Sequence, residues 1–212
     1  MAAETSQTLD RGCRVLRVLA DTPDGLSVTE LASTLGVNRT VTYRLVSTLE
    51  QHGLVRRDAR GRLFIGLGIV HLAAAVQPAL RDLAVPLLRG LADEVGCTAF
   101  LAVADGGEVL ALAVVEPSWT VLHVAYRVGA RHPMPHGGSG PAIQLGRDRS
   151  QLPFVVSDGV QYPGVRSLAA PVRGVPGLEA SVGVLSLGDE VDADTLGPPV
   201  VAAAEALSAR IR

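Results

Sequence analysis

The sequence contains no lysine, only two cysteines and few aromatic residues. All 19 basic residues are Arg, and aromatic residues make up 3% of the 212 positions. Cys13 and Cys97 are too few and too far apart for a disulfide framework or a zinc site, which favours two small buried hydrophobes. No apolar run reaches the roughly 18 residues that span a bilayer, and the polar residues 1–10 lack the pattern of a signal peptide. We therefore expect a cytoplasmic protein with no membrane partner.

The charges that are present are unevenly distributed along the chain. Residues 1–66 hold nine Arg and seven acidic residues (+2), whereas residues 67–212 hold ten Arg and fourteen acidic residues (−4), which gives the net charge of −2. Within residues 38–62, six Arg stand against two acidic residues. A local basic cluster on an acidic chain is typical of a small DNA-binding module. The hydrophobic content of 48% is enough for one large or two small globular domains.

The first part of the chain carries the start and stop signals of short helices. Apolar residues recur at helical spacing over residues 8–20. The motif Ser27-Val-Thr-Glu30 then forms a capping box, in which the serine hydroxyl and the glutamate carboxylate each accept a backbone N–H. Gly36 can adopt the left-handed conformation that ends this second helix.

A third helix and a basic hairpin follow directly. Asn38 is a suitable N-cap for a helix over residues 39–51. Short strands over residues 54–57 and 62–65 flank a plausible turn at residues 58–61. This order predicts a winged helix-turn-helix over residues 1–66.

The third helix has the two faces that a helix in the major groove requires. Its apolar residues form one side, and short polar groups and Arg form most of the other. We predict that the helix, its caps and the hairpin bind double-stranded DNA through Ser27, Asn38, Arg39, Thr40, Thr42, Tyr43, Arg44, Ser47, Arg56, Arg57, Arg60 and Arg62. Arg39, Thr40 and Tyr43 are expected to meet base edges and flanking phosphates, and the hairpin Arg to meet phosphates or a minor groove. The alternatives are that the Arg form a solvated face of a structural helix pair and that Tyr43 covers the helix junction.

The remainder of the chain predicts a connector and an α+β domain. Residues 67–84 are expected to form a connector helix, kinked or divided at Pro78, and residues 85–212 an effector-binding and oligomerisation domain. Expected elements of this domain are a helix over 86–94, strands over 97–103, 108–115, 121–128, 166–172 and 180–187, a loop over 131–140, and a last helix that begins at Pro198. Sequential hairpin strands with helices at the ends favour an antiparallel sheet.

Residues 26–55, 128–142 and 167–172 together resemble the IclR-type family of bacterial transcription regulators. The resemblance covers most of the chain. It implies an α+β fold, with an N-terminal winged helix-turn-helix that is mostly helical with a small β-wing. The C-terminal part is then a GAF-like α/β domain with an antiparallel sheet, which senses a small molecule. The resemblance also implies a homodimer or a dimer of dimers.

The resemblance places an effector pocket at the glycine-rich loop and at the strand that carries Ala-Ala-Pro. The positions carried over are His136, Gly137, Gly138, Ser139, Gly140, Asp158, Ser167 and Ser186. Backbone N–H groups of such a loop, next to a helix N-terminus, can hold an anionic head group, so we expect a small carboxylate or another polar metabolite.

The chain departs from the family pattern within this predicted pocket. Pro141 stands where family members often have Lys, the span 142–167 is shorter, and an acidic residue is replaced around residues 160–161. The alternative is therefore a ligand-independent regulator with a degraded effector pocket.

Neither a cofactor, nor a metal, nor catalysis is expected. His132 and His136 are four residues apart, but they lie in a Pro/Gly-rich loop without a further ligand at useful spacing. Ser139 lies in Gly-Gly-Ser-Gly-Pro, which lacks the alternation of a nucleophile elbow, and no partner base is evident. An enzyme that merely carries a helix-turn-helix is the alternative from another class.

Overall fold

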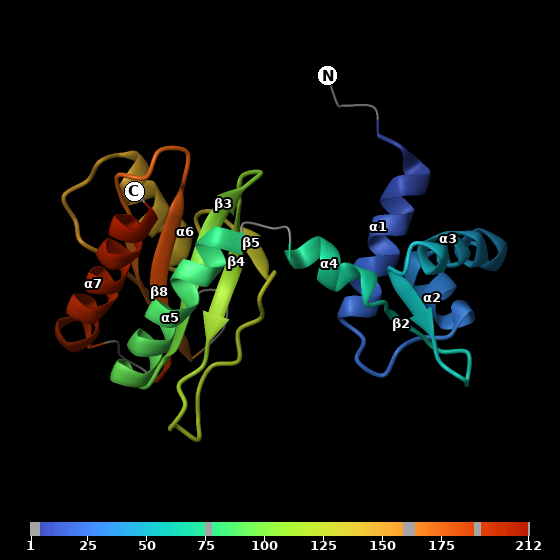
Figure 1. Ribbon diagram of the computed structural model, residues 1–212, viewed down its shortest axis with the longest axis horizontal. Coiled ribbons are helices and arrows are strands. Elements are labelled where there is room, and N and C mark those ends of the chain that lie inside the picture. Colours follow the sequence, from blue (N-terminus) through green and yellow to red (C-terminus); the bar gives the residue numbers. More distant parts are fainter. Residues whose placement is uncertain (1–4, 75–77, 159–163, 189–191, 212) are drawn as a thin grey trace. The chain divides into compact units, whose positions relative to one another are not determined.

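The computed structural model describes residues 5–74, 78–158, 164–188 and 192–211, and the chain divides into two units, residues 1–77 and 78–212 (Figure 1). The division falls inside the predicted connector, whose role as a link between two domains stays a prediction. Within the described residues, no helix is both long and apolar enough to cross a membrane.

The first unit is a winged helix-turn-helix, as the sequence predicts. Its elements are α1 (Gln7–Ala20), α2 (Val28–Leu35), α3 (Arg39–Gln51), β1 (Val55–Arg57), β2 (Leu63–Ile65) and α4 (Gly68–Ala74). Strands β1 and β2 pair antiparallel, and Leu63 exchanges backbone hydrogen bonds with Leu26 ahead of α2. Val15, Leu31 and Val46, from three different helices, are fully buried together with Leu63. The wing is therefore part of the core of this unit.

The second unit is built on a six-stranded sheet in which all neighbouring strands are antiparallel. Its elements are α5 (Pro78–Val95), β3 (Thr98–Asp105), β4 (Glu108–Val115), β5 (Arg131–Pro133), α6 (Ser139–Arg147), β6 (Val155–Ser157), β7 (Val165–Val172), β8 (Ala180–Leu187) and α7 (Ala193–Ile211). The strand order is β5-β4-β3-β8-β7-β6. The predicted antiparallel sheet is thus confirmed.

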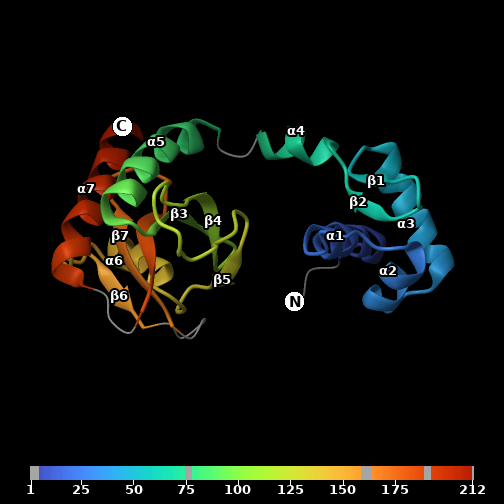
Figure 2. The ribbon, with the colours of Figure 1, turned by 90° about the horizontal axis from the view of Figure 1, so that it is seen from below.

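The two faces of this sheet pack against different helices (Figures 1 and 2). Alternate side chains of a strand point to opposite faces. Leu101 and Val103 of β3 therefore join the core formed with α5 and α7, whereas Phe100 and Ala102 pack with Ile143 of α6. The α6 face is only partly covered, and the cavity described below lies on it.

Residues 121–128 do not form the strand that their composition predicts. The segment between β4 and β5 is irregular, and the Thr98 hydroxyl donates a hydrogen bond to the Val124 carbonyl at 2.6 Å. Val124 and Tyr126 line a cavity, whereas Val121 and Leu122 are exposed. The alternation in the sequence therefore reflects a loop between a cavity and solvent, and the expected loop after it contains the short strand β5.

The two helices that were expected to start at Pro86 and Pro198 both start earlier in the chain. Pro86 lies inside α5 instead of starting a helix, although an interior proline costs about 3 kcal/mol. The packing of Leu88 and Leu91 in the core offsets this cost. Helix α7 begins at Ala193, ahead of Pro198, because the Asp192 carboxylate accepts two backbone N–H groups of the first turn at 3.1 Å each.

Candidate functional site

The outer face of α3 is open to solvent at its N-terminal end. The Asn38 side chain caps the helix by accepting the backbone N–H of Thr40 at 2.8 Å. Arg39, Thr40 and Arg44 are exposed, and Tyr43 is 57% exposed, so Tyr43 does not merely cover the helix junction. The apolar back of α3, with Leu45 and Val46, is buried in the core. Short polar groups and two Arg are therefore presented on one side of a rigidly packed helix.

Besides Asn38, three of the predicted DNA contacts cap a helix or are at least partly buried. Ser27 and Glu30 form the predicted capping box, and its hydrogen bonds from the Ser27 backbone and side chain lower the pKa of Glu30. Thr42 is fully buried and its hydroxyl donates to the Asn38 carbonyl at 3.2 Å, so its predicted DNA contact is wrong for this fold. Ser47 is half-buried.

The Arg62 guanidinium is held by hydrogen bonds within the fold, although 38% of its side chain is exposed. Its Nε donates to the Asp24 carbonyl at 2.8 Å and its Nη2 to the Gly25 carbonyl at 2.7 Å. Its Nη1 also lies 3.8 Å from the Glu30 carboxylate. The guanidinium therefore joins the wing to the turn ahead of α2, and we leave Arg62 out of the proposed interface.

The other wing Arg differ in how firmly they are held. Arg57 makes a two-point ion pair with Glu50 of α3, at 3.2 and 3.3 Å. The Arg56 guanidinium lies over the Phe64 ring, 4.5 Å from its centroid. Arg60 is exposed in the turn between the strands. Arg57 is thus held by the fold, whereas Arg60 lies in the exposed turn and Arg56 is oriented by an aromatic ring.

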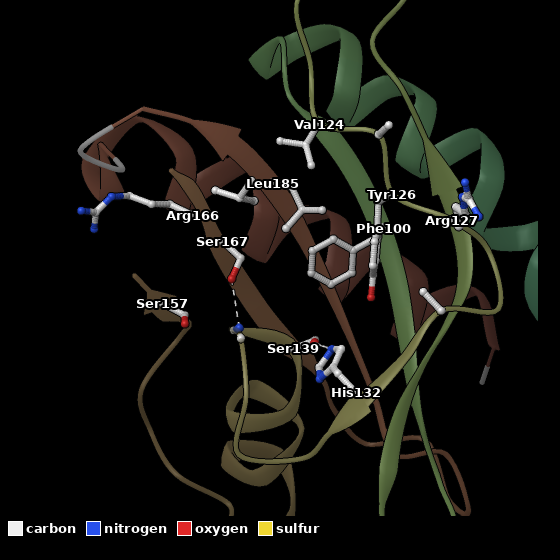
Figure 3. A pocket seen from close by; sticks show the side chains of 15 residues that line it. Phe100, Val124, Tyr126, Arg127, His132, Ser139, Ser157, Arg166, Ser167 and Leu185 are labelled. Carbon is white, nitrogen blue, oxygen red and sulfur yellow. Dashed lines mark hydrogen bonds between the residues drawn. The ribbon is translucent and has the colours of Figure 1, made fainter. Parts of the chain in front are cut away.

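A cavity of about 430 Å³ lies in the second unit on the α6 side of the sheet (Figure 3). Its walls come from strands β3, β5, β6, β7 and β8, from the loop ahead of β5, and from the start of α6. The lining residues are Phe100, Val124, Ala125, Tyr126, Arg127, Ala130, His132, Gly137, Gly138, Ser139, Ser157, Val165, Arg166, Ser167 and Leu185. Among these described lining residues none is acidic.

The cavity combines a group of polar side chains with an aromatic wall. Ser139 Oγ lies 3.0 Å from His132 Nε2, and Ser167 Oγ accepts the Gly138 N–H at 2.9 Å (Figure 3). Phe100 and Tyr126 meet edge to face, with ring centroids 5.8 Å apart. Such a combination of an apolar wall with a few convergent polar groups is typical of a small-molecule site.

Half of the predicted pocket positions line this cavity. Gly137, Gly138, Ser139 and Ser167 do so, whereas His136, Gly140, Asp158 and Ser186 are not among the lining residues. His136 is exposed. Asp158 forms an ion pair with Arg166, whose guanidinium points away from Ser139 and Ser167 (Figure 3).

Sheet geometry explains why Ser186 does not line the cavity, and packing explains why residue 140 is glycine. Ser186 follows Leu185 on β8 and therefore faces the other side of the sheet, where it contacts Cys97. Burial raises the pKa of that thiol. Gly140 is needed for packing, because any Cβ there would overlap the Met134 carbonyl. The replaced acidic position around residues 160–161 lies outside the described residues.

The sequence did not indicate that Phe100, Tyr126, Arg127 and Arg166 line the cavity. Nor did it indicate that His132 contacts Ser139. Side chains alternate between the two faces of a strand, so Ser167 on β7 could have indicated which residues of β8 share its face. That inference requires the register between β7 and β8, which the sequence does not provide. Cys97 is half-buried, but Cys13 is exposed rather than buried as expected. In the described part of the chain, no three His, Cys, Asp or Glu residues gather as a metal site would require.

Comparison with known proteins places the chain in a defined class. A family model of the IclR helix-turn-helix domain matches residues 8–59. The chain is 30% identical over 181 residues to the HTH-type transcriptional regulator KipR of Bacillus subtilis, covering 84% of this chain and 71% of that protein. It is also 30% identical over 141 residues to the transcriptional repressor IclR of Escherichia coli, covering 65% of this chain and 52% of that repressor. The latter match thus spans about half the length of the repressor.

Solved structures of low sequence identity share the fold across both units. An IclR transcriptional regulator from Alicyclobacillus acidocaldarius has a TM-score of 0.80 at 20% identity, covering 99% of this chain and 100% of that one. An IclR homolog from Microbacterium hydrocarbonoxydans, complexed with 4-hydroxybenzoate, also has a TM-score of 0.80, at 19% identity and with coverage of 97% and 99%.

A helix-turn-helix with an exposed α3 face, followed by a unit of this second type, is the organisation shared with the IclR-type transcription regulators that the comparisons found. Within that class, the chain belongs to the IclR family.

Proposed function

We propose that the chain is a ligand-responsive, sequence-specific DNA-binding regulator that acts as a homodimer or a dimer of dimers in the cytoplasm. The observation that carries the DNA-binding role is the exposed N-terminal face of α3, with Arg39, Thr40, Tyr43 and Arg44 on an apolar back. Two such helices in a dimer read a pseudo-palindromic site, whose half-site spacing the dimer sets.

The exposed Arg are proposed to have two different tasks. Arg39 is the first residue of α3 and is placed to read a base edge, because recognition helices contact bases near their N-termini. Arg60 lies at the tip of the wing and is placed to meet a phosphate. The ion pair of Arg57 with Glu50 supports a role in fixing the wing on α3.

The variants Arg39→Ala and Arg60→Ala are expected to separate these tasks. Loss of Arg39 should cost about 1–3 kcal/mol of binding free energy and relax the sequence preference at one position of each half-site. Loss of Arg60 should weaken binding evenly across sequences and reduce the slope of log K against log salt by about one. The measurement is binding of full-length protein to sites selected from a random duplex library, at several salt concentrations.

Arg17→Ala is the matched control for these variants, because Arg17 is an exposed Arg of the same unit on α1. It should leave both the preference and the salt slope unchanged. Arg62→Ala is unsuitable as a test of DNA contact, since its loss frees two carbonyls within the fold. Wild-type binding by both test variants would place the interface elsewhere.

The cavity of the second unit is proposed to bind the small-molecule effector. Its polar part offers His132, Ser139 and Ser167, Arg127 is among its lining residues, and the aromatic pair forms an apolar wall. These features favour a small carboxylate with an apolar body, the class to which 4-hydroxybenzoate belongs, which is bound by one neighbour of the same fold. Such a ligand changes DNA affinity only if it binds the DNA-competent and incompetent states unequally.

Thermal unfolding tests the ligand proposal. A matching carboxylate from a panel of aliphatic and aromatic acids, at 100 times its Kd, should stabilise the protein by about 2.7 kcal/mol. Leu185→Trp should remove this stabilisation by filling the cavity, whereas Leu187→Trp, at an exposed position of the same strand, should retain it. If no member of the panel stabilises the wild type, the ligand-independent regulator is favoured.

A further inference from the structure

The fold supplies the base that the sequence does not reveal beside Ser139. His132 lies in β5, seven residues earlier, and is 6% exposed. Its Nε2 is 3.0 Å from the Oγ of Ser139, which is itself 3% exposed. Both side chains line the cavity (Figure 3), so a bound molecule can reach this pair.

The second ring nitrogen of His132 fixes the direction of this hydrogen bond. Nδ1 lies 3.1 Å from the Pro133 carbonyl. Because a carbonyl oxygen only accepts, Nδ1 carries the proton and Nε2 of the neutral ring is left as an acceptor. The Ser139 hydroxyl therefore donates to Nε2. A serine that donates to an imidazole, whose other nitrogen is held by a third group, has the arrangement of an activated nucleophile.

The position of Ser139 in α6 adds electrostatic stabilisation. Ser139 is the first residue of this helix, and the first N–H groups of a helix have no partner within it. The positive end of the helix dipole lies at the same place. Negative charge that develops on the carbonyl oxygen of a bound ligand is therefore stabilised next to the nucleophile.

We propose that Ser139 and His132 form a nucleophile–base pair that hydrolyses small carboxylic esters bound in the cavity. Ser139 Oγ attacks the ester carbonyl carbon while its proton moves to His132 Nε2. The bond from the carbonyl carbon to the alcohol oxygen then breaks, and His132 returns the proton to the departing alcohol. This leaves an acyl group on Ser139 Oγ.

Water completes the reaction by the same route. It attacks the acyl carbon and gives a proton to His132, which passes it to Ser139 Oγ as the carboxylic acid departs. The balance is ester plus water to acid plus alcohol. The inference rests on the proposed small-molecule cavity, and the acid formed belongs to the class of ligand proposed for it.

The other serines of the cavity lack this arrangement. Ser167 Oγ accepts the Gly138 N–H, which fixes the loop ahead of α6. Among the hydrogen bonds of the described residues, His132 is paired with Ser139 and not with Ser157 or Ser167. The proposal therefore assigns the acyl group to one named oxygen atom.

The test uses full-length protein with p-nitrophenyl acetate and p-nitrophenyl butyrate. Release of nitrophenolate measures turnover, and the mass of the tryptic peptides locates the acyl group. Wild type should gain one acyl group on Ser139, and Ser139→Ala should lower the turnover rate about 100-fold or to the buffer background. His132→Gln should lower it similarly. Ser186→Ala, on the other face of the sheet, should match the wild type.

Thermal unfolding of each variant shows whether it is folded, and Ser139→Cys provides a second variant that should still be acylated. Equal turnover by wild type and Ser139→Ala, with no acyl group on Ser139, would overturn the proposal. Stabilisation by a carboxylate without acylation would likewise overturn it while the sensing role stood. Acylation of Ser139 in a protein that no carboxylate stabilises would support the pair and count against sensing.

Discussion

Gly140→Ala is expected to lower the free energy of unfolding of the second unit by about 3 kcal/mol or more. The added Cβ would overlap the Met134 carbonyl oxygen, and that neighbour is backbone rather than a flexible side chain. The loop ahead of α6 or the helix start must then shift, which also displaces Ser139. Urea unfolding of the full chain, with the transition of each unit fitted separately, measures the effect.

Gly90→Ala is the matched control, because Gly90 lies inside α5 and nothing lies within 4 Å of an added Cβ. Alanine should stabilise that helix by about 0.5–1 kcal/mol relative to glycine. The same chemical change should therefore have opposite signs at the two positions. Equal stability of the two variants would contradict the close approach of Gly140 to Met134.

Among substitutions in the wing, Leu63→Ala is expected to lower the free energy of unfolding of the first unit the most. Leu63 is 0% exposed and contributes to the core shared by the helices, so its truncation should cost about 2–5 kcal/mol. DNA binding should fall with the folded fraction of this unit. The second unit has a core of its own, and its unfolding midpoint should stay the same. Circular dichroism and DNA binding on the same samples measure both.

Leu67→Ala is the control for this truncation, since Leu67 is 82% exposed and only four residues away. Its effect on unfolding should stay within about 0.5 kcal/mol. A loss of stability as large as that of Leu63→Ala would mean that Leu67 is covered in the protein in solution.

The first unit was predicted well because its signals are local. Helix α3 has the predicted bounds, since Asn38 and Gly53 mark its ends by hydrogen bonds and turns within a few residues. The capping box at Ser27 is formed as predicted for the same reason. The charge pattern could not show that Arg62 is hydrogen-bonded within the fold. Its acceptors are the carbonyls of Asp24 and Gly25, which lie 38 and 37 residues away in the sequence.

The second unit was predicted less completely because its pattern depends on strand pairing. Strands β4 and β8 have the predicted bounds, but residues 121–128 alternate like a strand without pairing as one. Ser186 was misplaced because one residue of register moves a side chain to the other face. His132 meets Ser139 only because β5 pairs with β4 and brings the histidine next to the start of α6.

The two-sided sheet ties the cavity mechanically to the helix core. Phe100 lines the cavity, and the next residue, Leu101, packs against the α5 and α7 side. Because consecutive residues share one rigid peptide plane, a guest that pushes Phe100 outward also displaces Leu101. Leu101 shares its core with Leu88 of α5 and Leu207 of α7. A ligand that moves Phe100 is therefore expected to disturb the packing of Leu101 beneath α5 and α7, on the opposite face of the sheet.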